Sequence, residues 1–320
     1  MPSRRRFNPI ALLLSTFMIL PAMSAHAQAV ESAVAEVAGG NARQSLDEAW
    51  WTGPILAANA ETLPPGHVYI EPYLFDVLRR GSATPGSLSY LLYGVAPRFT
   101  AGVLPSFSYA ENSAGRRHLR MGDATLNFQY RLTAANPRKT TPTVALVVQP
   151  RLPTARHDRL ATAGSGAGNG NYATMAGVYT QQYLWLPNGR IMRARLNVTH
   201  TFEGTARVRD ISVYGTPAGF RGRVRPGSST VLNAAVEYSL TKRFVIALDV
   251  LHQWNGPTRV RDDRTAMTAS SKRSSYFAIA PGLEYNWSPS QGVIAGARWI
   301  RAGHNSSGSL TPVVAYSLFL

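Results

Sequence analysis

The stretch that decides the fold runs from Met192 to Phe202 and reads MRARLNVTHTF. Apolar and polar residues alternate along it. Such alternation places every second side chain on the same face of an extended strand, so we predict a β-strand here with one apolar and one polar face. One face carries Met192, Ala194, Leu196, Val198 and Phe202, and the other carries Arg193, Arg195, Asn197, Thr199 and Thr201.

The same period recurs from Gly66 to the end of the chain, clearest in residues 124–132, 232–240 and 244–254. We predict 12 strands, at 66–78, 87–94, 98–110, 121–132, 142–154, 171–186, 190–203, 229–240, 243–255, 274–286, 291–303 and 310–320. A soluble sandwich turns the polar face of each strand to water, whereas a membrane barrel turns the apolar face to lipid. Alternation alone does not separate these two folds.

The connections and the aromatic residues favour the barrel. Short turns, such as Pro187-Asn188-Gly189 and Ser288-Pro289-Ser290, alternate with longer loops such as 155–170, 204–228 and 256–273. Phe244 and Trp254 lie on one face of one strand, and ten residues of tilted strand span about 24 Å of membrane. Outer-membrane barrels have an apolar band of about this height between two aromatic girdles. We therefore predict an all-β, transmembrane, antiparallel up-and-down barrel with short periplasmic turns and long extracellular loops.

The last strand is also the C-terminus, because Val314, Tyr316, Leu318 and Leu320 alternate to the final residue. Barrel proteins commonly end in this way, since the barrel-assembly machinery reads the final strand. Most end in Phe or Trp, whereas Phe319 is the penultimate residue here. The barrel-assembly machinery is therefore an expected partner.

The N-terminus reads as an export signal. Arg4, Arg5 and Arg6 precede the apolar stretch Ile10–Leu20 and the small-x-small site Ala25-His26-Ala27, so we expect cleavage after Ala27 and residence in a Gram-negative outer membrane. Residues 28–65 break the strand pattern and form a periplasmic N-terminal segment, which either enters the lumen as a plug or lies below it. Partial insertion is favoured. Residues 66–320 form the barrel.

Charge is concentrated in the predicted loops. The mature chain carries a net charge of +13, and five long loops, 79–86, 111–120, 155–170, 204–228 and 256–273, carry +12 of it. An exported barrel rarely meets nucleic acid, so nucleic acid is not an expected partner. Contact with the phosphorylated outer leaflet, formed by lipopolysaccharide, explains basic loops. Recruitment of an anionic solute to the pore mouth is the alternative.

Ten charged residues are predicted to point into the lumen. They are Arg131, Arg151, Arg193, Arg195, Arg298, Glu71, Asp123, Glu237, Asp249 and Glu284. Charges in a narrow interior are costly unless they are paired. A salt-bridge network that fills and stiffens the barrel is one interpretation, and a positive ladder at Arg193 and Arg195 that selects anions is the other.

No catalytic, cofactor-binding or metal-binding pattern is predicted, so we do not expect an enzyme. The sequence contains no cysteine. His200 has no evident serine partner, and no third group orients it. The glycines of 164–170 lack the Lys-Ser/Thr ending of a phosphate-binding loop.

Five prolines fall inside predicted strands, although proline cannot donate to a strand ladder. They are Pro72, Pro105, Pro150, Pro281 and Pro312. Pro72 lies in the first strand and Pro312 in the last, which must meet to close the barrel. Either these prolines occupy bulges that shape the wall, or the seam is a weak wall through which an apolar solute leaves sideways.

Several short motifs resemble the outer-membrane family named after the meta-pathway of phenol degradation. They are Gly122–Leu132 (GDATLNFQYRL), Arg151-Leu152-Pro153-Thr154, Gly164-Ser165-Gly166, and the loop from Tyr214-Gly215-Thr216 to Pro226-Gly227. The family usually has Gly after Leu-Pro-Thr, where this chain has Ala155. The resemblance covers about residues 60–320, and it implies an outer-membrane barrel thought to pass hydrophobic or aromatic compounds.

The expected function is therefore passive uptake of small, hydrophobic or aromatic molecules. Two alternatives stay open. One is a structural barrel with lipopolysaccharide-binding loops and no significant conductance, and the other is an anion-selective porin. Neither the solute nor the oligomeric state follows from the sequence.

Overall fold

The computed structural model describes residues 43–111, 117–136 and 141–320. They fall within one compact unit, Ala42–Leu320. The predicted signal peptide, its cleavage after Ala27 and the segment 28–42 lie outside the described residues. Across the described ranges, no helix is long and apolar enough to cross a membrane.

Strands make up most of the described residues, with two short 3-10 helices. The strands are β1 (Val68–Arg79), β2 (Ser82–Ala96), β3 (Phe99–Val103), β4 (Ser106–Glu111), β5 (Arg117–Met121), β6 (Ala124–Thr133), β7 (Thr143–Leu152), β8 (Ala173–Trp185), β9 (Ile191–Glu203), β10 (Ala206–Arg209), β11 (Arg221–Arg225), β12 (Ser229–Ser239), β13 (Phe244–Asn255), β14 (Arg259–Asp262), β15 (Thr268–Ser270), β16 (Ser274–Ser288), β17 (Gln291–His304) and β18 (Ser309–Phe319). The 3-10 helices are η1 (Leu46–Glu48) and η2 (Ala163–Ser165).

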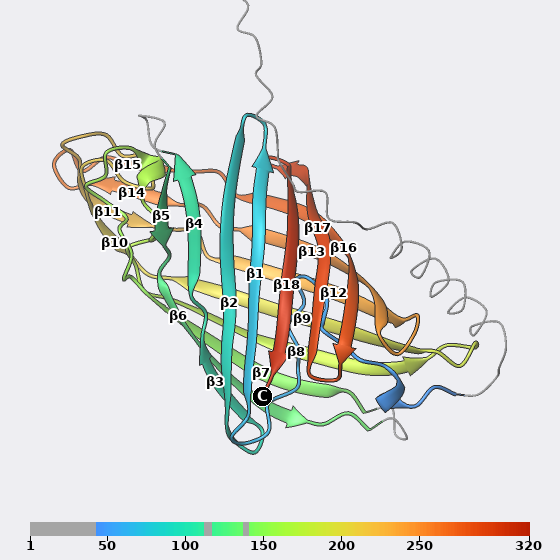
Figure 1. Cartoon of the computed structure of the whole chain (residues 1–320). Coiled ribbons are helices and arrows are strands. Elements are labelled where there is room, and N and C mark those ends of the chain that lie inside the picture. Colours follow the sequence, from blue (N-terminus) through green and yellow to red (C-terminus); the bar gives the residue numbers. More distant parts are fainter. Residues whose placement is uncertain (1–42, 112–116, 137–140) are drawn as a thin grey trace, which may run out of the picture. The chain divides into compact units, whose positions relative to one another are not determined.

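Twelve of the strands close into an antiparallel barrel, which confirms the predicted fold. The order around the wall is β1-β18-β17-β16-β13-β12-β9-β8-β7-β6-β3-β2, and β2 pairs with β1 to complete the circle. β4 pairs with β2 beyond the end of β3, and β5 pairs with β4. Figure 1 shows the long strands running side by side, with first strand β1 beside last strand β18.

Alternation decides which side chains face outward, as the β12–β13 pair illustrates. Ala235 lies opposite Asp249 and Val236 lies opposite Leu248. Asp249 is fully buried inside the barrel, whereas Leu248 is 39% exposed on the outer wall. The aromatic residues lie toward the two ends of the wall. Rings pair near the short turns, as Phe244 does with Tyr285 at 4.9 Å, and near the long loops, as His252 does with Trp254 at 4.2 Å.

Three predicted boundaries are wrong, and each has a local cause. Residues 79–86 form no long loop, because Gly81 adopts a positive φ of 77° and Arg79 pairs with Ser82 across a tight hairpin. The predicted strand 98–110 breaks at Leu104-Pro105, where proline lacks an N–H for the ladder. The predicted strand 121–132 breaks at Gly122-Asp123, since the Asp123 carboxylate accepts the backbone N–H groups of Ala155 and Asn169.

The two longest predicted loops contain a second sheet that the sequence reading missed. β10, β11, β14 and β15 form a four-stranded antiparallel sheet at the end of the barrel where the long loops lie (Figure 1). One face of this sheet packs around Ala206, Val208, Phe220 and Val224. Its strands are three to five residues long, and their frequent arginines made them look like solvated loop.

Candidate functional site

Residues 43–50 lie against the end of the barrel where the short turns are, and the chain then runs inside the barrel from Trp51 onward. The Gln44 N–H donates to Gly189 O in the β8–β9 turn, and Trp50 N–H donates to Lys242 O in the β12–β13 turn. The chain returns to the same end, where Gly66 N–H donates to Gly94 O near the β2–β3 turn. We call residues 43–65 the inner segment.

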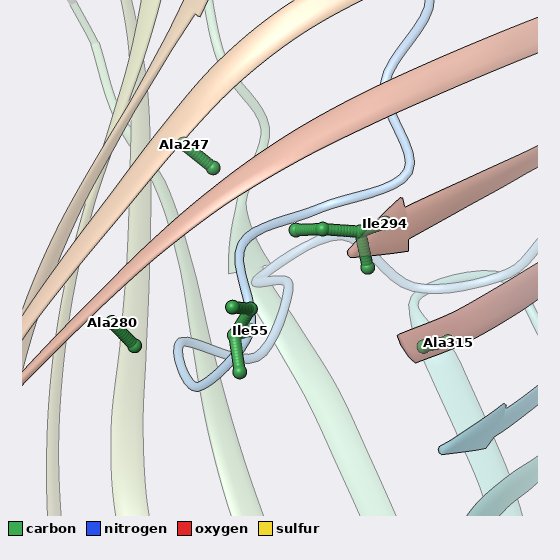
Figure 2. Close-up of a cluster of buried hydrophobic side chains, with 5 residues drawn as sticks. All are labelled: Ile55, Ala247, Ala280, Ile294 and Ala315. Carbon is green, nitrogen blue, oxygen red and sulfur yellow. The ribbon is translucent and has the colours of Figure 1, made fainter. Parts of the chain in front are cut away.

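The inner segment packs its apolar side chains against small residues of the wall. Ile55 lies against Ala247 on β13, Ala280 on β16, Ile294 on β17 and Ala315 on β18, as Figure 2 shows. On the other side of the lumen, Ala60 packs with Ala145, Val147 and Tyr179 from β7 and β8. The alanines leave the space that a polypeptide needs inside a barrel of 12 strands.

Two predicted lumen carboxylates hold the backbone of the inner segment. Glu284 accepts the N–H groups of Thr52 (2.6 Å) and Gly53 (3.1 Å). Asp249 accepts those of Leu56 (3.2 Å) and Ala57 (2.8 Å). Buried backbone N–H groups outside regular structure need such acceptors. Both carboxylates therefore anchor the segment.

The carbonyl groups of the segment are held by amide and guanidinium side chains. Arg195 donates to Ala57 O at 2.7 Å, and Asn197 donates to Ala58 O at 2.9 Å. Gln129 donates to the carbonyl groups of both Asn59 and Glu61. Asn197 and Gln129 lie on the polar faces of their strands. They were not predicted as site residues, because only charged side chains were predicted to line the lumen.

Arg193, Arg195 and Glu237 form one buried ion cluster. Arg193 donates to the Glu237 carboxylate through two nitrogens, Nε and Nη2. Arg195 Nε lies 3.2 Å from Glu237 Oε2. All three side chains are at most 5% exposed. The Arg193 guanidinium also lies 4.7 Å from the ring of Trp51 in the inner segment. These arginines are thus paired and covered.

The remaining predicted lumen residues are dispersed. Arg131 pairs with Glu61 of the inner segment at 2.6 Å, whereas Arg151 pairs with Glu203 at 2.6 Å near the long loops. Arg298 is half-buried, and within the described part of the chain its Nε has no hydrogen-bond partner. The predicted candidates therefore belong to three different environments.

A cavity of about 280 Å³ runs beside the inner segment and is the candidate solute site. Its lining includes residues 51–59 and 61–64 of the segment and aromatic rings of β1, β2 and β8. Tyr73 and Tyr90 meet edge to face with ring centres 6.0 Å apart, next to buried Glu71. Arg195, which also lines the cavity, contributes the opposite charge. The wall combines these aromatic rings with polar side chains, such as those of Thr100, Asn127 and Gln149.

The loop at 153–170 is fastened to the mouth of the barrel. Asp123 binds it through Ala155 and Asn169, and Arg120 donates to the carbonyl groups of Gly164 and Gly166. Tyr214 donates to Asn169 O. Burial, with Glu203 nearby, raises the pKa of Tyr214, so the phenol stays a neutral donor. A second cavity of about 440 Å³ lies between His118–Met121 and this loop.

Four of the five predicted prolines lie inside strands, and they interrupt their ladders without shifting the register. The β1–β18 ladder pairs Ile70 with Leu318 and Tyr73 with Ala315 in one constant register, but skips Pro72 and Pro312. Each proline is paired on its other side, Pro72 with Ser89 and Pro312 with Ala297. Pro150 and Pro281 interrupt the β6–β7 and β16–β17 ladders in the same way. The seam between β1 and β18 therefore contains two of these four interruptions, and the other two lie elsewhere in the barrel wall.

A family model described as the MetA-pathway of phenol degradation matches residues 54–310. The chain belongs to this family. The match confirms the resemblance seen in the sequence motifs, and it includes residues 54–65 of the inner segment.

Solved structures share the fold. An outer-membrane channel from Pseudomonas putida F1 has a TM-score of 0.61 at 15% identity, over 83% of this chain and 100% of that one. The toluene transporter TodX of P. putida has a TM-score of 0.35 at 12% identity, over 85% and 95%. The NanC porin has a TM-score of 0.42 at 12% identity, over 78% and 98%. No curated protein matches the sequence.

Proposed function

We propose that this protein is a passive outer-membrane channel for small hydrophobic or aromatic molecules. The observation that carries the proposal is the tyrosine-lined cavity beside the inner segment. Aromatic rings pack against one another at centre distances of about 4.5–7 Å, so the tyrosine side of the cavity suits an aromatic solute, and a cavity of about 150 Å³ is enough to hold benzene. Membership of the phenol-degradation family supports the same class of solute.

The inner segment is the plug of this channel. It has no strand or α-helix of its own, so it is held by side-chain hydrogen bonds and apolar packing rather than by a continuous ladder. Its anchors, Asp249 and Glu284, lie on adjacent strands β13 and β16, and the residues that they hold line the cavity. A shift of the segment away from these anchors therefore changes the size of the cavity without breaking the barrel.

A reversible crosslink tests the plug. A β-carbon at position 292 would lie 2.5 Å from Thr52 Oγ1 and closer still to Asn286 Oδ1. Once the Asn286 side chain turns away, Thr52→Cys and Gly292→Cys bring two sulfurs close enough for a bond of about 2 Å. The chain has no other cysteine. Planar-bilayer conductance and phenol or toluene uptake into proteoliposomes are measured with oxidant and again with reductant. We expect oxidation to close the channel and reduction to restore it.

The two single-cysteine variants are the controls, because each changes the contacts around Asn286 without forming a crosslink. Equal uptake in the crosslinked and reduced states would refute the plug. No conductance or uptake in either state, with a folded barrel, would refute the channel. It would favour the second candidate, a structural barrel held by lipopolysaccharide.

Anion selectivity is the weaker alternative. Arg193 and Arg195 share one carboxylate and are buried against the inner segment, which supports a structural role. They line an anion path only after the plug moves. Substitution of both arginines distinguishes a structural role from an anion path, because only an anion path makes the reversal potential of the channel depend on them.

Export and assembly complete the proposal. Residues 1–27 are the signal peptide, and cleavage after Ala27 releases the mature N-terminus, which N-terminal sequencing of the membrane protein checks. β18 offers the barrel-assembly machinery a final strand with alternating outward residues. Transport here is non-enzymatic. In residues 43–111, 117–136 and 141–320, no group of three His, Asp or Glu side chains is placed to hold a metal ion.

A further inference from the structure

Seven arginines stand on one face of the small sheet formed by β10, β11, β14 and β15. Along each of the first three strands, arginines alternate with residues of the opposite face, such as Val208, Val224 and Val260. That opposite face carries the apolar cluster. The seven are Arg207, Arg209, Arg221, Arg223, Arg225, Arg259 and Arg261, and all are exposed. We call this surface the arginine face.

The register brings these like charges directly together. Arg207 lies opposite Arg223, and Arg223 lies opposite Arg261. Arg209 faces Arg221, and Arg225 faces Arg259, in the rows on either side. Adjacent strands are about 4.8 Å apart, and like charges at directly opposed positions destabilise a sheet. The folded chain therefore gains nothing from placing them in rows.

No acidic residue of the described chain neutralises the arginine face. None of the seven guanidinium groups forms an ion pair or a side-chain hydrogen bond with another described residue. Asp262 belongs to the opposite face, because its partner is buried Gly222. Asp210 and Asp263 lie in the turns that follow β10 and β14. The charge of the arginine face is therefore available to another molecule.

The arginine face is turned away from the lumen. The apolar face packs against Tyr214, which donates to Asn169 in the loop at 153–170. Asn169 is in turn bound by Asp123 at the mouth of the barrel. The apolar face thus looks toward the barrel mouth, and the arginines look outward. A surface with this orientation does not guide an anionic solute into the pore.

The arginine rows begin just beyond the apolar band of the barrel. Outward-facing Phe202 is 58% exposed and Trp254 is 46% exposed, and they mark the outer aromatic girdle. Arg207 and Arg259 each follow one of these rings by five residues, which is at most about 17 Å of extended chain. Lipid headgroups begin at this girdle and extend about 5–8 Å beyond the hydrocarbon core, so the first arginines of the rows lie within reach of them.

We propose that the arginine face binds the phosphate groups of lipopolysaccharide in the surrounding outer leaflet. Guanidinium groups form bidentate, charge-assisted hydrogen bonds with phosphate. Three parallel rows of arginine match a surface of repeated phosphates better than one free anion. Because the site lies outside the lumen, it does not depend on the proposed transport function.

The test removes the central row with Arg207→Gln, Arg223→Gln and Arg261→Gln in the full-length purified barrel. Binding of bisphosphorylated lipid A in mixed micelles is measured against the unchanged protein. Loss of even one charge-assisted contact weakens binding about tenfold, so we expect at least that decrease. The control variant Arg79→Gln, Arg80→Gln and Arg301→Gln removes the same charge from exposed residues on β1, its hairpin and β17, and it should retain its affinity.

Two further ligands identify the source of the phosphate. Dephosphorylated lipid A should bind the unchanged protein at least about tenfold more weakly than the bisphosphorylated form, and inorganic pyrophosphate should compete poorly. Gel mobility before and after heating confirms that each variant is a folded barrel. Unchanged affinity in the central-row variant, or equal losses in that variant and the control, would overturn the proposal. So would equal binding of dephosphorylated lipid A or strong competition by pyrophosphate.

Discussion

The lumen and the arginine face both contain arginines, but those of the lumen are paired and buried, whereas those of the arginine face are exposed and, within the described chain, unpaired. In the lumen, Arg193 and Arg195 share Glu237 and are at most 5% exposed. On the arginine face, Arg223 stands between two other arginines and is exposed to solvent. Water screens the second arrangement but not the first.

This difference distinguishes charges that stabilise the fold from charges that are free to bind another molecule. An unpaired charge inside a barrel costs several kcal/mol, so each buried arginine of the lumen cluster is paired with a carboxylate or caps a carbonyl group. An exposed like-charge row costs little, and its charge remains free for a partner. The lumen charges therefore bind one another and the inner segment. The surface charges remain free for the anionic molecule that we propose as their ligand.

The largest expected effect comes from removing the anchors of the inner segment. Asp249→Asn with Glu284→Gln weakens four hydrogen bonds to the segment, and a hydrogen bond to a charged group contributes about 1.5–3 kcal/mol. We expect a lower thermal midpoint and a severalfold larger or more frequent channel opening in planar bilayers. Asp263→Asn, an exposed acid in a long loop, is the matched control. Conductance that stays at the level of the unchanged protein would mean that these carboxylates do not hold the plug closed.

The second effect concerns the ion cluster itself. Glu237→Gln leaves two buried arginines without their carboxylate, and breaking a buried pair costs about 3–5 kcal/mol. The reversal potential should move toward anion selectivity in any channel that still opens. Arg193→Gln with Arg195→Gln should move it the other way, toward neutrality. If neither variant changes the reversal potential, the cluster is structural only.

A third and smaller effect tests the seam between the first and last strands. Leu74 and Val314 are paired on the outer face between the interruptions at Pro72 and Pro312. A disulfide between Leu74→Cys and Val314→Cys fixes the two strands together, and a lateral exit there predicts reduced uptake of an aromatic solute. Val236→Cys with Leu248→Cys makes the equivalent bond in an uninterrupted ladder and should leave uptake unchanged. Undiminished uptake after seam crosslinking would exclude this exit.

The smallest effect is expected on the arginine face without any ligand. Arg223→Gln removes two directly opposed like-charge pairs, each worth about 0.2–1 kcal/mol. The thermal midpoint in detergent should stay constant or rise slightly, most clearly at low salt. Arg264→Gln, in the β14–β15 turn, is the control and should show no such gain. A clear loss of stability would show that the central arginine row stabilises the fold, as the lumen arginines do.

The strand count and the inward charges were predictable because alternation is a local property. In residues 192–202, one register already assigns Arg193 and Arg195 to the lumen, and Leu196, 48% exposed, to the outer wall. The prolines were visible too, but their effect was not. Only the ladders show that Pro72 and Pro312 interrupt the seam without a bulge.

The position of the inner segment within the barrel was predicted only as one of two options, because its contacts with the barrel wall are all long-range. Thr52 meets Glu284 across 232 residues of chain, and no pattern within residues 28–65 encodes that distance. The small sheet was missed for a related reason. Strands of three to five residues, such as β10 and β15, are too short for periodicity to stand out from a charged loop.

The sequence by itself determined that this chain forms a membrane barrel of 12 strands with a polar lumen, since a period of two fixes the face of every side chain. Only the tertiary structure decided that the lumen is occupied, which charges are paired and which are free. Those outcomes depend on closure of the barrel, which brings β13, β16 and the inner segment within hydrogen-bond reach of one another.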